Sequence, residues 1–215
     1  MNKVNILLVD DHELFRSGLR RILQDRDDLV VMDEAASGEE ALVKVRKNLP
    51  DLVLMDINMP GLGGMETIRR LQRMHPELPV IVVTILNDDP FPRRLLDAGA
   101  RGFVTKGDSA DELFTAIDTV LQGKYHISRS VAQKLALSGF LGEAEASPLA
   151  TLTPREMQTM LMLAQGKTNG EIADIISRSP KTISTFRKRL FEKLGVTSNV
   201  ELYQLALRYK LVDPL

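Results

Sequence analysis

The sequence predicts an α/β domain with a parallel, doubly wound sheet, followed by a small all-α domain. Two observations lead to this fold class. Over roughly the first 123 residues, short apolar runs alternate with amphipathic stretches, which is typical of parallel strands joined by crossover helices. From about Leu152 onwards only helical patterns remain. A length of 215 residues is enough for two such domains, each with its own core.

Five buried strands are expected in the first domain, at residues 4–9, 30–32, 52–55, 80–84 and 102–105. The first helix is expected around Phe15, Leu19 and Ile22, which have helical spacing. The other helices are expected at residues 39–47, 65–74, 93–98 and 110–121. Right-handed crossovers place helices on both faces of the sheet. We expect the strand order 2-1-3-4-5, a common doubly wound arrangement.

The chain is expected to divide into a sheet domain at residues 1–123, a linker with one helix at residues 124–150, and a helical domain at residues 151–215. The formal net charge of −1 conceals an asymmetry between these parts. Residues 151–215 carry 10 Lys/Arg against 6 Asp/Glu, whereas residues 1–150 carry 18 against 23. The basic C-terminal part is therefore the one expected to meet a polyanion.

Composition excludes several classes of protein. The chain has no cysteine, which excludes disulfides and thiol chemistry and agrees with a cytoplasmic location. Apolar runs such as residues 80–83 are far too short to span a bilayer. Asp10 and Asp11 interrupt the first apolar run, so neither a signal peptide nor a membrane partner is expected.

Three acids fall at the ends of predicted strands. Asp10 and Asp11 follow the first strand, and Asp56 follows the third. These two strands are neighbours in the expected order, and ligands of doubly wound sheets bind at the carboxyl ends of the strands. The three carboxylates should therefore converge on one crevice.

Clustered carboxylates repel one another and need a cation. Oxygen ligands with room for water favour Mg²⁺ over zinc. Thr84 and Lys106 end the fourth and fifth strands on the same edge. Together these groups form a phosphoryl site, in which Asp56 attacks phosphorus while Thr84 and Lys106 hold two of its oxygens. Each acid alone is more simply a solvated loop residue, but five polar residues at the ends of four strands favour a site.

The strand ends carry the motifs LLVDDH (residues 7–12), LVLMDINMPGLGG (52–64), VVT (82–84) and GFVTKG (102–107). Over about residues 3–123 the sequence thereby resembles the receiver domain of bacterial response regulators. The resemblance implies that a partner histidine kinase phosphorylates Asp56. It also implies that Asp11, Asp56 and the carbonyl of Asn58 ligate Mg²⁺, with Asp10 acting mostly through water.

The same resemblance makes Phe103 an aromatic switch residue, which moves inward as Thr84 shifts towards the phosphoryl group; a core phenylalanine is the simpler explanation, and both can hold. Two residues depart from the family's pattern. Proline often follows the lysine, but Gly107 stands here. The residue after the switch threonine is usually small, whereas Ile85 is β-branched. Because Ile85 hinders an attacking water molecule, we predict slow self-dephosphorylation, and an unchanged phosphoryl half-life in Ile85→Ala would contradict this.

Capping signals divide the C-terminal part into short helices. Thr153, Pro154 and Glu156 form an N-cap, an N1 proline and a capping-box acid, and the helix they start is expected to end at Gly166. Further helices are expected at about residues 169–176 and 181–194. Short helices joined by tight turns are typical of a helix-turn-helix.

The third of these helices has an apolar stripe and a basic face. The stripe consists of Ile183, Phe186, Leu190 and Leu194. Residues 178–193 carry six basic residues against one acid. Such a charge run is usually only a solvated face, but on the last helix of a helix-turn-helix it favours DNA.

The motifs LTPREM (152–157), GKTNGEIA (166–173) and SPKTISTFRKRLFEKLGV (179–196) resemble the helix-turn-helix of NarL/FixJ (LuxR-type) regulators, over about residues 151–212. By position, Ser184, Thr185 and Lys188 would face base edges, while Lys181 and Thr182 would contact phosphates. A final helix at residues 200–209 would form a homodimer contact, for which core packing is the simpler explanation.

With DDPFPRRL (88–95) and FEKL (191–194), and with Phe186 where histidine is common, the sequence looks most like the GacA/UvrY branch of this family. Pro90 and Pro92 are expected to shorten the fourth helix.

The sequence therefore predicts a response regulator in which phosphorylation of Asp56 controls DNA binding and transcription, with no enzymatic activity beyond self-phosphorylation and self-dephosphorylation. Phosphorylation would either unmask the recognition helix or drive dimerisation onto half-sites about 10 base pairs apart. One alternative is a Mg²⁺-dependent phosphohydrolase, but the haloacid-dehalogenase type has a second acid two residues after its first-strand nucleophile, where His12 follows Asp10 here. Another is an unphosphorylated regulator that acts through protein contacts alone.

Overall fold

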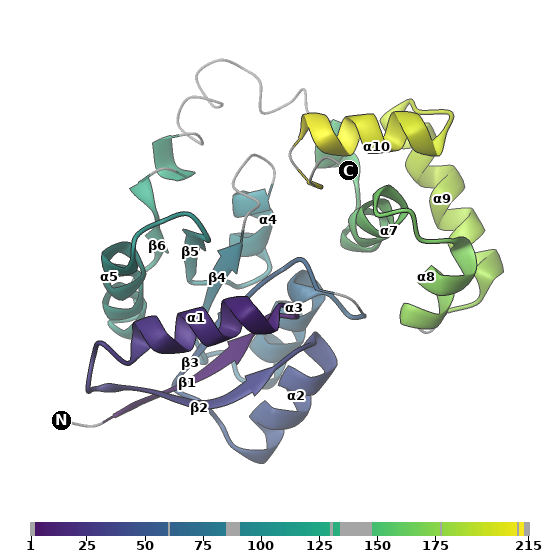
Figure 1. Cartoon of the computed structure of the whole chain (residues 1–215). Coiled ribbons are helices and arrows are strands. Elements are labelled where there is room, and N and C mark those ends of the chain that lie inside the picture. The colour runs from purple at the N-terminus through teal and green to yellow at the C-terminus, as the bar shows by residue number, and fades with distance from the viewer. Residues whose placement is uncertain are drawn as a thin grey trace. The chain divides into compact units, whose positions relative to one another are not determined.

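The structure, a computed structural model, describes residues 3–59, 61–84, 91–129, 131–133, 148–176, 178–209 and 211–212. They form two compact units, an N-terminal unit within residues 3–133 and a C-terminal unit within residues 148–212 (Figure 1). Ile85, Pro90 and residues 134–147, which include much of the expected linker, lie outside the described residues.

The N-terminal unit is built on one parallel sheet. Its strands are β1 (Val4–Val9), β2 (Leu29–Ala35), β3 (Leu52–Met55), β4 (Val80–Thr84), β5 (Gly102–Thr105) and β6 (His126–Ile127). Their order is β2-β1-β3-β4-β5-β6, and each neighbouring pair is parallel. The predicted fold class and the order of the first five strands are confirmed, and a sixth strand extends the sheet beyond β5.

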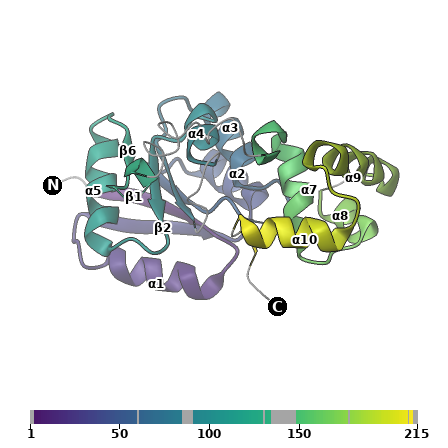
Figure 2. The same cartoon turned by 90° about the horizontal axis from the view of Figure 1, so that it is seen from above.

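Helices cover both faces of this sheet (Figures 1 and 2). On one face lie α1 (Glu13–Leu23) and α5 (Ala110–Leu121), and on the other lie α2 (Gly38–Lys47), α3 (Gly64–Met74) and α4 (Phe91–Asp97). Leu23 of α1 and Ile117 of α5 are almost fully buried in the apolar core on their face. Each such side chain contributes about 1.5–3 kcal/mol by leaving water. α4 has seven residues and includes Pro92, while Pro90 lies outside the described residues, so the expected shortening by both prolines stays a prediction.

β2 is longer than predicted, because it pairs with β1 along the whole length of that strand, from Val4 opposite Leu29 to Val9 opposite Ala35. The sequence predicted only residues 30–32, since the polar Asp33 and Glu34 end the apolar run. β2 is the outermost strand of the sheet, where polar side chains remain in contact with water.

β6 continues the chain after α5. Ile127 pairs with Phe103 of β5, and the N–H of Ser128 donates to the carbonyl of Phe103 at 3.0 Å. A two-residue strand is too short to give a pattern of its own, which is why it was not predicted. One helix was expected within the linker at residues 124–150, and of its described part, residues 129 and 131–133 are helical.

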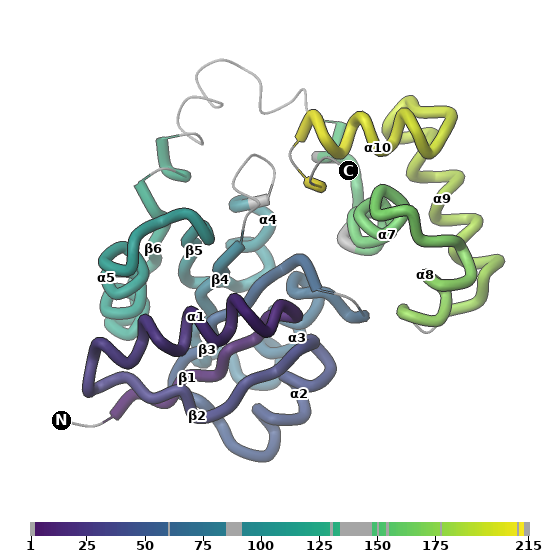
Figure 3. Tube along the Cα trace, in the orientation of Figure 1, coloured from purple at the N-terminus to yellow at the C-terminus, as the bar shows by residue number. Residues whose placement is uncertain are grey.

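The C-terminal unit is helical (Figure 3). It comprises a 3₁₀ turn at Pro148–Thr151 and the helices α7 (Pro154–Ala164), α8 (Asn169–Ile175), α9 (Pro180–Leu194) and α10 (Asn199–Arg208). The predicted capping box of Thr153 and Glu156 is present at the start of α7. α9 ends at Gly195, whose φ of 65° suits glycine. α9 packs against α7 and α8, and α10 packs against α7.

Candidate functional site

Two acids are brought together at the carboxyl edge of the central strands. Asp10 directly follows β1 and Asp56 directly follows β3, which pairs with β1. The N–H of Asp56 donates to the carbonyl of Val9 at 2.8 Å, and the N–H of Asp10 donates to that of Ala35 at 3.0 Å. Ladder bonds thus continue one residue past each strand and fix both backbones. Both residues are only 3% exposed.

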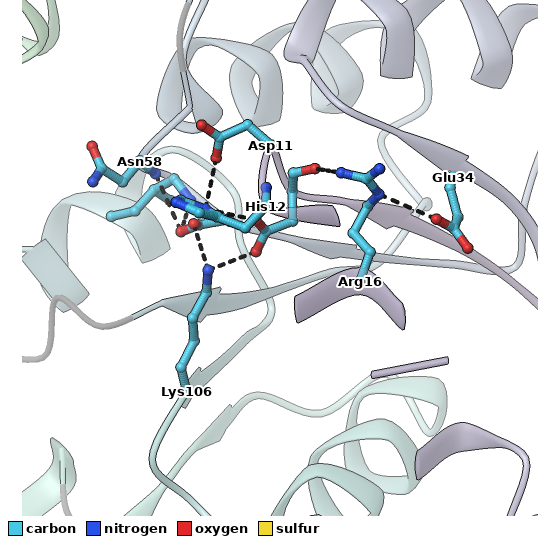
Figure 4. Close-up of polar contacts among 9 residues, drawn as sticks. Asp11, His12, Arg16, Glu34, Asn58 and Lys106 are labelled. Carbon is cyan, nitrogen blue, oxygen red and sulfur yellow. Dashed lines mark hydrogen bonds and ion pairs between the residues drawn. The ribbon is translucent and has the colours of Figure 1, made fainter. Parts of the chain in front are cut away.

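Lys106 bridges the two acids. Its Nζ lies 2.6 Å from Oδ2 of Asp10 and 2.8 Å from Oδ2 of Asp56 (Figure 4). Its backbone N–H donates to the carbonyl of Thr84 at 2.9 Å, so the end of β4 positions it. Burial acts to lower the pKa of Lys106, but the charges and hydrogen bonds of Asp56 and Asp10 outweigh burial and raise this pKa above its usual value. Lys106 is therefore charged, and it neutralises part of the acidic cluster.

The second oxygen of Asp56 is held by backbone donors. Oδ1 accepts from the N–H of Ile57 at 2.6 Å and from the N–H of Asn58 at 3.2 Å. The two carboxylate oxygens therefore have different partners, peptide N–H groups for Oδ1 and the ammonium of Lys106 for Oδ2. Asn58 is thus placed beside the carboxylate through its N–H, and the expected role of its carbonyl as a magnesium ligand stays a prediction.

The loop after Asp56 is packed closely at Gly64, the first residue of α3. A Cβ atom at this position would lie 2.4 Å from the carbonyl oxygen of Asp56 and 2.5 Å from Cα of Ile57. The N–H of Gly64 also donates to the carbonyl of Ile57 at 3.2 Å. The backbone that carries Asp56 thus lies against α3, and only glycine leaves room for this contact.

Asp10, Asp11, His12 and Asp56 form a cluster whose candidate ligand atoms all lie within 4.8 Å of one another. Oδ1 of Asp11 is buried and has no hydrogen-bond partner among the described residues. Nδ1 of His12 lies 3.1 Å from this oxygen, within ion-pair distance but not in hydrogen-bonding geometry. Burial raises the pKa of Asp11 above its usual value, and the charges of Asp10 and Asp56 add to this effect while His12 opposes it. A cation would remove this electrostatic cost.

His12 was not predicted to belong to the site. It is the N-cap residue of α1, and its N–H donates to Oδ1 of Asp10 at 2.8 Å. Nδ1 of its ring lies beside the carboxylates of both Asp10 and Asp11 (Figure 4). Its position directly after Asp10 and Asp11 was the only sequence signal for this placement.

The other residues predicted for the phosphoryl site lie on β4 and β5. Thr84 is the last residue of β4 and is fully buried, and Phe103 of β5 is fully buried as well. Phe103 pairs with Val82, and Thr84 pairs with Thr105. The two proposed switch residues therefore belong to directly paired strands.

The turn after β5 closes without the proline that is frequent in the family. The N–H of Thr105 donates to Oδ2 of Asp108 at 2.7 Å, and the N–H of Asp108 donates back to the carbonyl of Thr105 at 3.0 Å. Gly107 lies within this turn. The reciprocal pair of hydrogen bonds provides an alternative way to hold Lys106 at the edge of the sheet.

In the C-terminal unit, the predicted base-facing residues lie on the exposed side of α9. Ser184, Thr185 and Lys188 are exposed, as is Lys181, whereas Thr182 is partly buried. On the opposite side, Ile183 and Leu190 are fully buried and Leu194 is 8% exposed. The predicted division of α9 into an apolar and a basic face is therefore present, although Phe186 of the apolar stripe is only partly buried.

Ser184 and Lys193 of α9 form polar contacts with other parts of this unit, and these contacts were not predicted. Nδ2 of Asn169, on α8, donates to Oγ of Ser184 at 3.2 Å. Nζ of Lys193 donates to Oε2 of the buried Glu156, on α7, at 2.7 Å and to the carbonyl of Thr151 at 3.0 Å. The exposed face of α9 is thus presented by a framework with fixed geometry.

Within the described part of the chain, no helix combines the length and apolar character that crossing a membrane requires.

Two family models match the chain. The model described as response regulator receiver domain matches residues 6–118, and the model described as bacterial regulatory proteins, luxR family, matches residues 150–206. The first range includes the whole acidic cluster and the second includes the whole of α9.

Individual regulators are similar to the chain over nearly its whole length. It is 47% identical over 210 residues to the response regulator GacA of Pseudomonas viridiflava, and the aligned residues cover 98% of each chain. It is 42% identical over 210 residues to the response regulator UvrY of Escherichia coli (strain K12), which covers 98% of this chain and 96% of UvrY.

Among solved structures, RcsB from Salmonella enterica serovar Typhimurium, bound to promoter rprA in the presence of the phosphomimetic BeF₃⁻, matches with a TM-score of 0.72. It is 28% identical and covers 95% of this chain and 98% of the RcsB chain. With a receiver model, a luxR-family model and full-length relatives in agreement, the chain belongs to the two-component response regulators with a LuxR-type DNA-binding domain, in which phosphorylation controls DNA binding and transcription.

Proposed function

We propose that Asp56 is the residue that receives the phosphoryl group from a partner histidine kinase. The observation that carries this proposal is the ammonium of Lys106, 2.8 Å from Oδ2 of Asp56 in a site where the acid is 3% exposed. A developing phosphoryl group needs a fixed cation at this point. The two backbone N–H groups on Oδ1 orient the carboxylate before any donor arrives.

For the acidic cluster we propose Mg²⁺ as the cation, held by Asp11, Asp56 and the main-chain carbonyl of Asn58, with Asp10 acting mostly through water. Carboxylate oxygens within 4.8 Å of one another are the donor type that a hard cation requires. The buried Oδ1 of Asp11, which accepts no hydrogen bond from the described residues, supports a ligand at this position. When bound, Mg²⁺ supplies positive charge against the equatorial oxygens of the phosphoryl group.

The transfer step needs little further chemistry from the protein. A carboxylate oxygen of Asp56 forms a bond to phosphorus while the bond between phosphorus and the donor's imidazole nitrogen breaks, and the electron pair stays on that nitrogen. Lys106 then holds one phosphoryl oxygen and the hydroxyl of Thr84 holds another. Phe103, on the strand paired with β4, moves inward with Thr84 and reports the phosphorylated state to the rest of the domain.

For the output we propose sequence-specific binding of double-stranded DNA by α9. Ser184, Thr185 and Lys188 face base edges, while Lys181 and Thr182 contact phosphates. The exposure of four of these residues on one helix, opposite the buried Ile183 and Leu190, supports this assignment. In the solved RcsB complex a relative is bound to a promoter.

We further propose that the receiver occupies residues 1–123, the linker residues 124–150 and the DNA-binding domain residues 151–215. The active form is a cytoplasmic homodimer joined through α10. Chemistry beyond self-phosphorylation and self-dephosphorylation at Asp56 is not expected. Steady turnover of generic phosphate esters by the full chain would contradict this last point and favour a phosphohydrolase.

Genome-wide footprinting tests the phosphorylation control. The native chain and Asp56→Asn are compared with and without acetyl phosphate, alongside Asp33→Asn as a control, because Asp33 is an exposed acid that pairs with Lys44 on the surface. We expect acetyl phosphate to increase DNA occupancy by the native chain and by Asp33→Asn, and to leave Asp56→Asn unchanged. An equal response by Asp56→Asn would falsify the assignment of Asp56.

A further inference from the structure

The ammonium of Lys106 has a third neighbour besides its two acids. Its Nζ lies 4.2 Å from the centroid of the ring of Phe15, a residue in the first turn of α1. With Asp10 and Asp56 at 2.6 and 2.8 Å, the ammonium is enclosed by two carboxylates and one aromatic face. The side chain of Lys106 is accordingly only 12% exposed.

The ring of Phe15 is held in place by the start of α1. The N–H of His12 donates to Oδ1 of Asp10, and Nη1 of Arg16 donates to the carbonyl oxygen of Asp10 at 2.6 Å. These bonds tie the first turn of α1 to the end of β1. Phe15 itself packs against the apolar core between the sheet and helices α1 and α5. The ring is therefore a fixed partner rather than a mobile cover.

The three partners of Lys106 differ in what else they do. Asp10 and Asp56 also belong to the proposed cation site, and Asp56 loses its free carboxylate when it is phosphorylated. A phenyl ring does not ligate a hard cation, and its attraction for an ammonium comes from its permanent quadrupole. Of the three contacts, the one with Phe15 is thus independent of both metal and phosphoryl group.

We propose that Phe15 is a positioning residue for phosphoryl transfer, which acts by holding the ammonium of Lys106 at the site through a cation–π contact. This inference rests on the proposed phosphorylation of Asp56. It assigns to α1 a direct influence on the lysine at the end of β5, in addition to the role of α1 in the core. The simpler alternative is that Phe15 only fills space in the core, in which case any apolar side chain of similar size would support phosphorylation equally well.

Matched substitutions separate these two roles in the full chain. Phe15→Tyr keeps an aromatic face, whereas Phe15→Leu and Phe15→Met keep apolar volume without one. We expect Phe15→Leu and Phe15→Met to slow phosphorylation by acetyl phosphate at saturating Mg²⁺ by roughly three- to tenfold, and Phe15→Tyr to remain within about twofold of the native chain. Equal phosphorylation rates for the tyrosine and leucine variants would overturn the proposal, provided that thermal unfolding shows both variants to be folded.

A double-mutant cycle tests whether the effect passes through Lys106. In a Lys106→Met background, Phe15→Leu should change the phosphorylation rate by less than about twofold, because no ammonium remains to be held. If Phe15→Leu lowered the rate equally in both backgrounds, its role would be structural and the proposal would be wrong.

A measurement without phosphorylation keeps this inference distinct from the proposed function. The ring of Phe15 should shift the NMR signals of the Lys106 ε-methylene protons upfield in the metal-free chain, and this shift should persist in Phe15→Tyr and vanish in Phe15→Leu. Absence of the shift overturns the contact itself. Failure of the native chain to become phosphorylated at Asp56 contradicts the proposed function and, with it, any role of Phe15 in transfer. Normal phosphorylation of the native chain with no difference between Phe15→Leu and Phe15→Tyr contradicts the Phe15 proposal alone.

Discussion

Nζ of Lys106 lies 2.8 Å from Oδ2 of Asp56, so the proposed phosphoryl acceptor is paired with a cation before any phosphoryl group arrives. The same ammonium also neutralises Asp10. A single side chain therefore supports both the stability of the acidic cluster and the chemistry proposed for it.

Lys106→Met should lower the free energy of unfolding of the receiver in the absence of Mg²⁺ by about 2 kcal/mol, because two carboxylates of 3% exposure lose their counter-ion. Added Mg²⁺ should then stabilise the variant more than the native chain, since the metal replaces the missing charge. Thermal unfolding with and without Mg²⁺ measures both effects. The control is Lys44→Met, which removes more exposed ion pairs with Asp33 and Glu40 and should cost less than about 1 kcal/mol. Equal losses in the two variants would contradict the prediction.

Two glycines of the receiver should respond in opposite ways to alanine. At Gly64 the new Cβ would lie 2.4 Å from the backbone oxygen of Asp56, so the loop must move, and we expect a loss of at least about 2 kcal/mol together with slower phosphorylation. At Gly18, within α1, a Cβ meets nothing within 4 Å, and alanine should stabilise the helix by about 0.5–1 kcal/mol. Urea unfolding of both variants checks the two signs. A stable Gly64→Ala protein with normal phosphorylation would be incompatible with the close packing described for this loop.

The pair of Glu156 and Lys193 should make the DNA-binding unit sensitive to acid. Burial acts to raise the pKa of Glu156, but hydrogen bonds from Lys193 and Thr153 outweigh burial and lower this pKa below its usual value. The ionised carboxylate therefore contributes stability above the usual pKa of a glutamate, and this contribution is lost as the pH falls through the lowered pKa of the folded state.

Glu156→Gln should cost about 1–2 kcal/mol at neutral pH, and the difference from the native chain should shrink as the pH falls below the usual range of a glutamate. Urea titrations followed through the amide signals of α9 measure this locally. Glu171→Gln serves as the control, because Glu171 forms the corresponding capping box of α8 on an exposed surface; a smaller effect is expected there. A pH-independent difference for Glu156→Gln would be evidence against this ion pair.

Lys181 and Lys188, the first and last of the proposed DNA-contacting residues of α9, should have different effects on DNA binding. Lys181→Ala should weaken binding to all DNA sequences and reduce the slope of log affinity against log salt by about one, because it removes a phosphate contact. Lys188→Ala should cost about 1–3 kcal/mol on the preferred site and relax the preference for it, because it removes a contact with a base. Affinities on specific and scrambled duplexes at several salt concentrations distinguish the two effects. Identical behaviour of the two variants would show that their assigned roles are wrong.

Much of the fold was predictable because polar residues in the sequence mark the ends of strands. The predicted bounds of β3, β4 and β5 agree with the structure to the residue, since an acid, a threonine or a lysine follows or ends each apolar run. The error at β2 has the opposite origin. There, Asp33 and Glu34 look like the end of a strand, but pairing with β1 continues through them. Long-range hydrogen bonds decided what local composition could not.

The same distinction applies to the site. Strand ends alone predicted that Asp10, Asp56 and Lys106 would meet, because sheet order determines which ends are adjacent. The ring of Phe15 above the ammonium depends on the angle at which α1 leaves β1, and no spacing in the sequence encodes that angle. The contact of Asn169 with Ser184 likewise depends on how α8 crosses α9.

β6 has a consequence for how a movement at the proposed phosphoryl site is passed to the end of the receiver. Its links to β5 are main-chain pairings, including the hydrogen bond from Ser128 to the carbonyl of Phe103. A translation of β5 should therefore move the backbone of β6, where the chain leaves the receiver, together with it. Because nearly every residue has a backbone N–H and carbonyl, the pairing of β6 with β5 should survive substitution of the side chains of His126 and Ile127. A proline in β6 should weaken this pairing, since it removes a backbone donor.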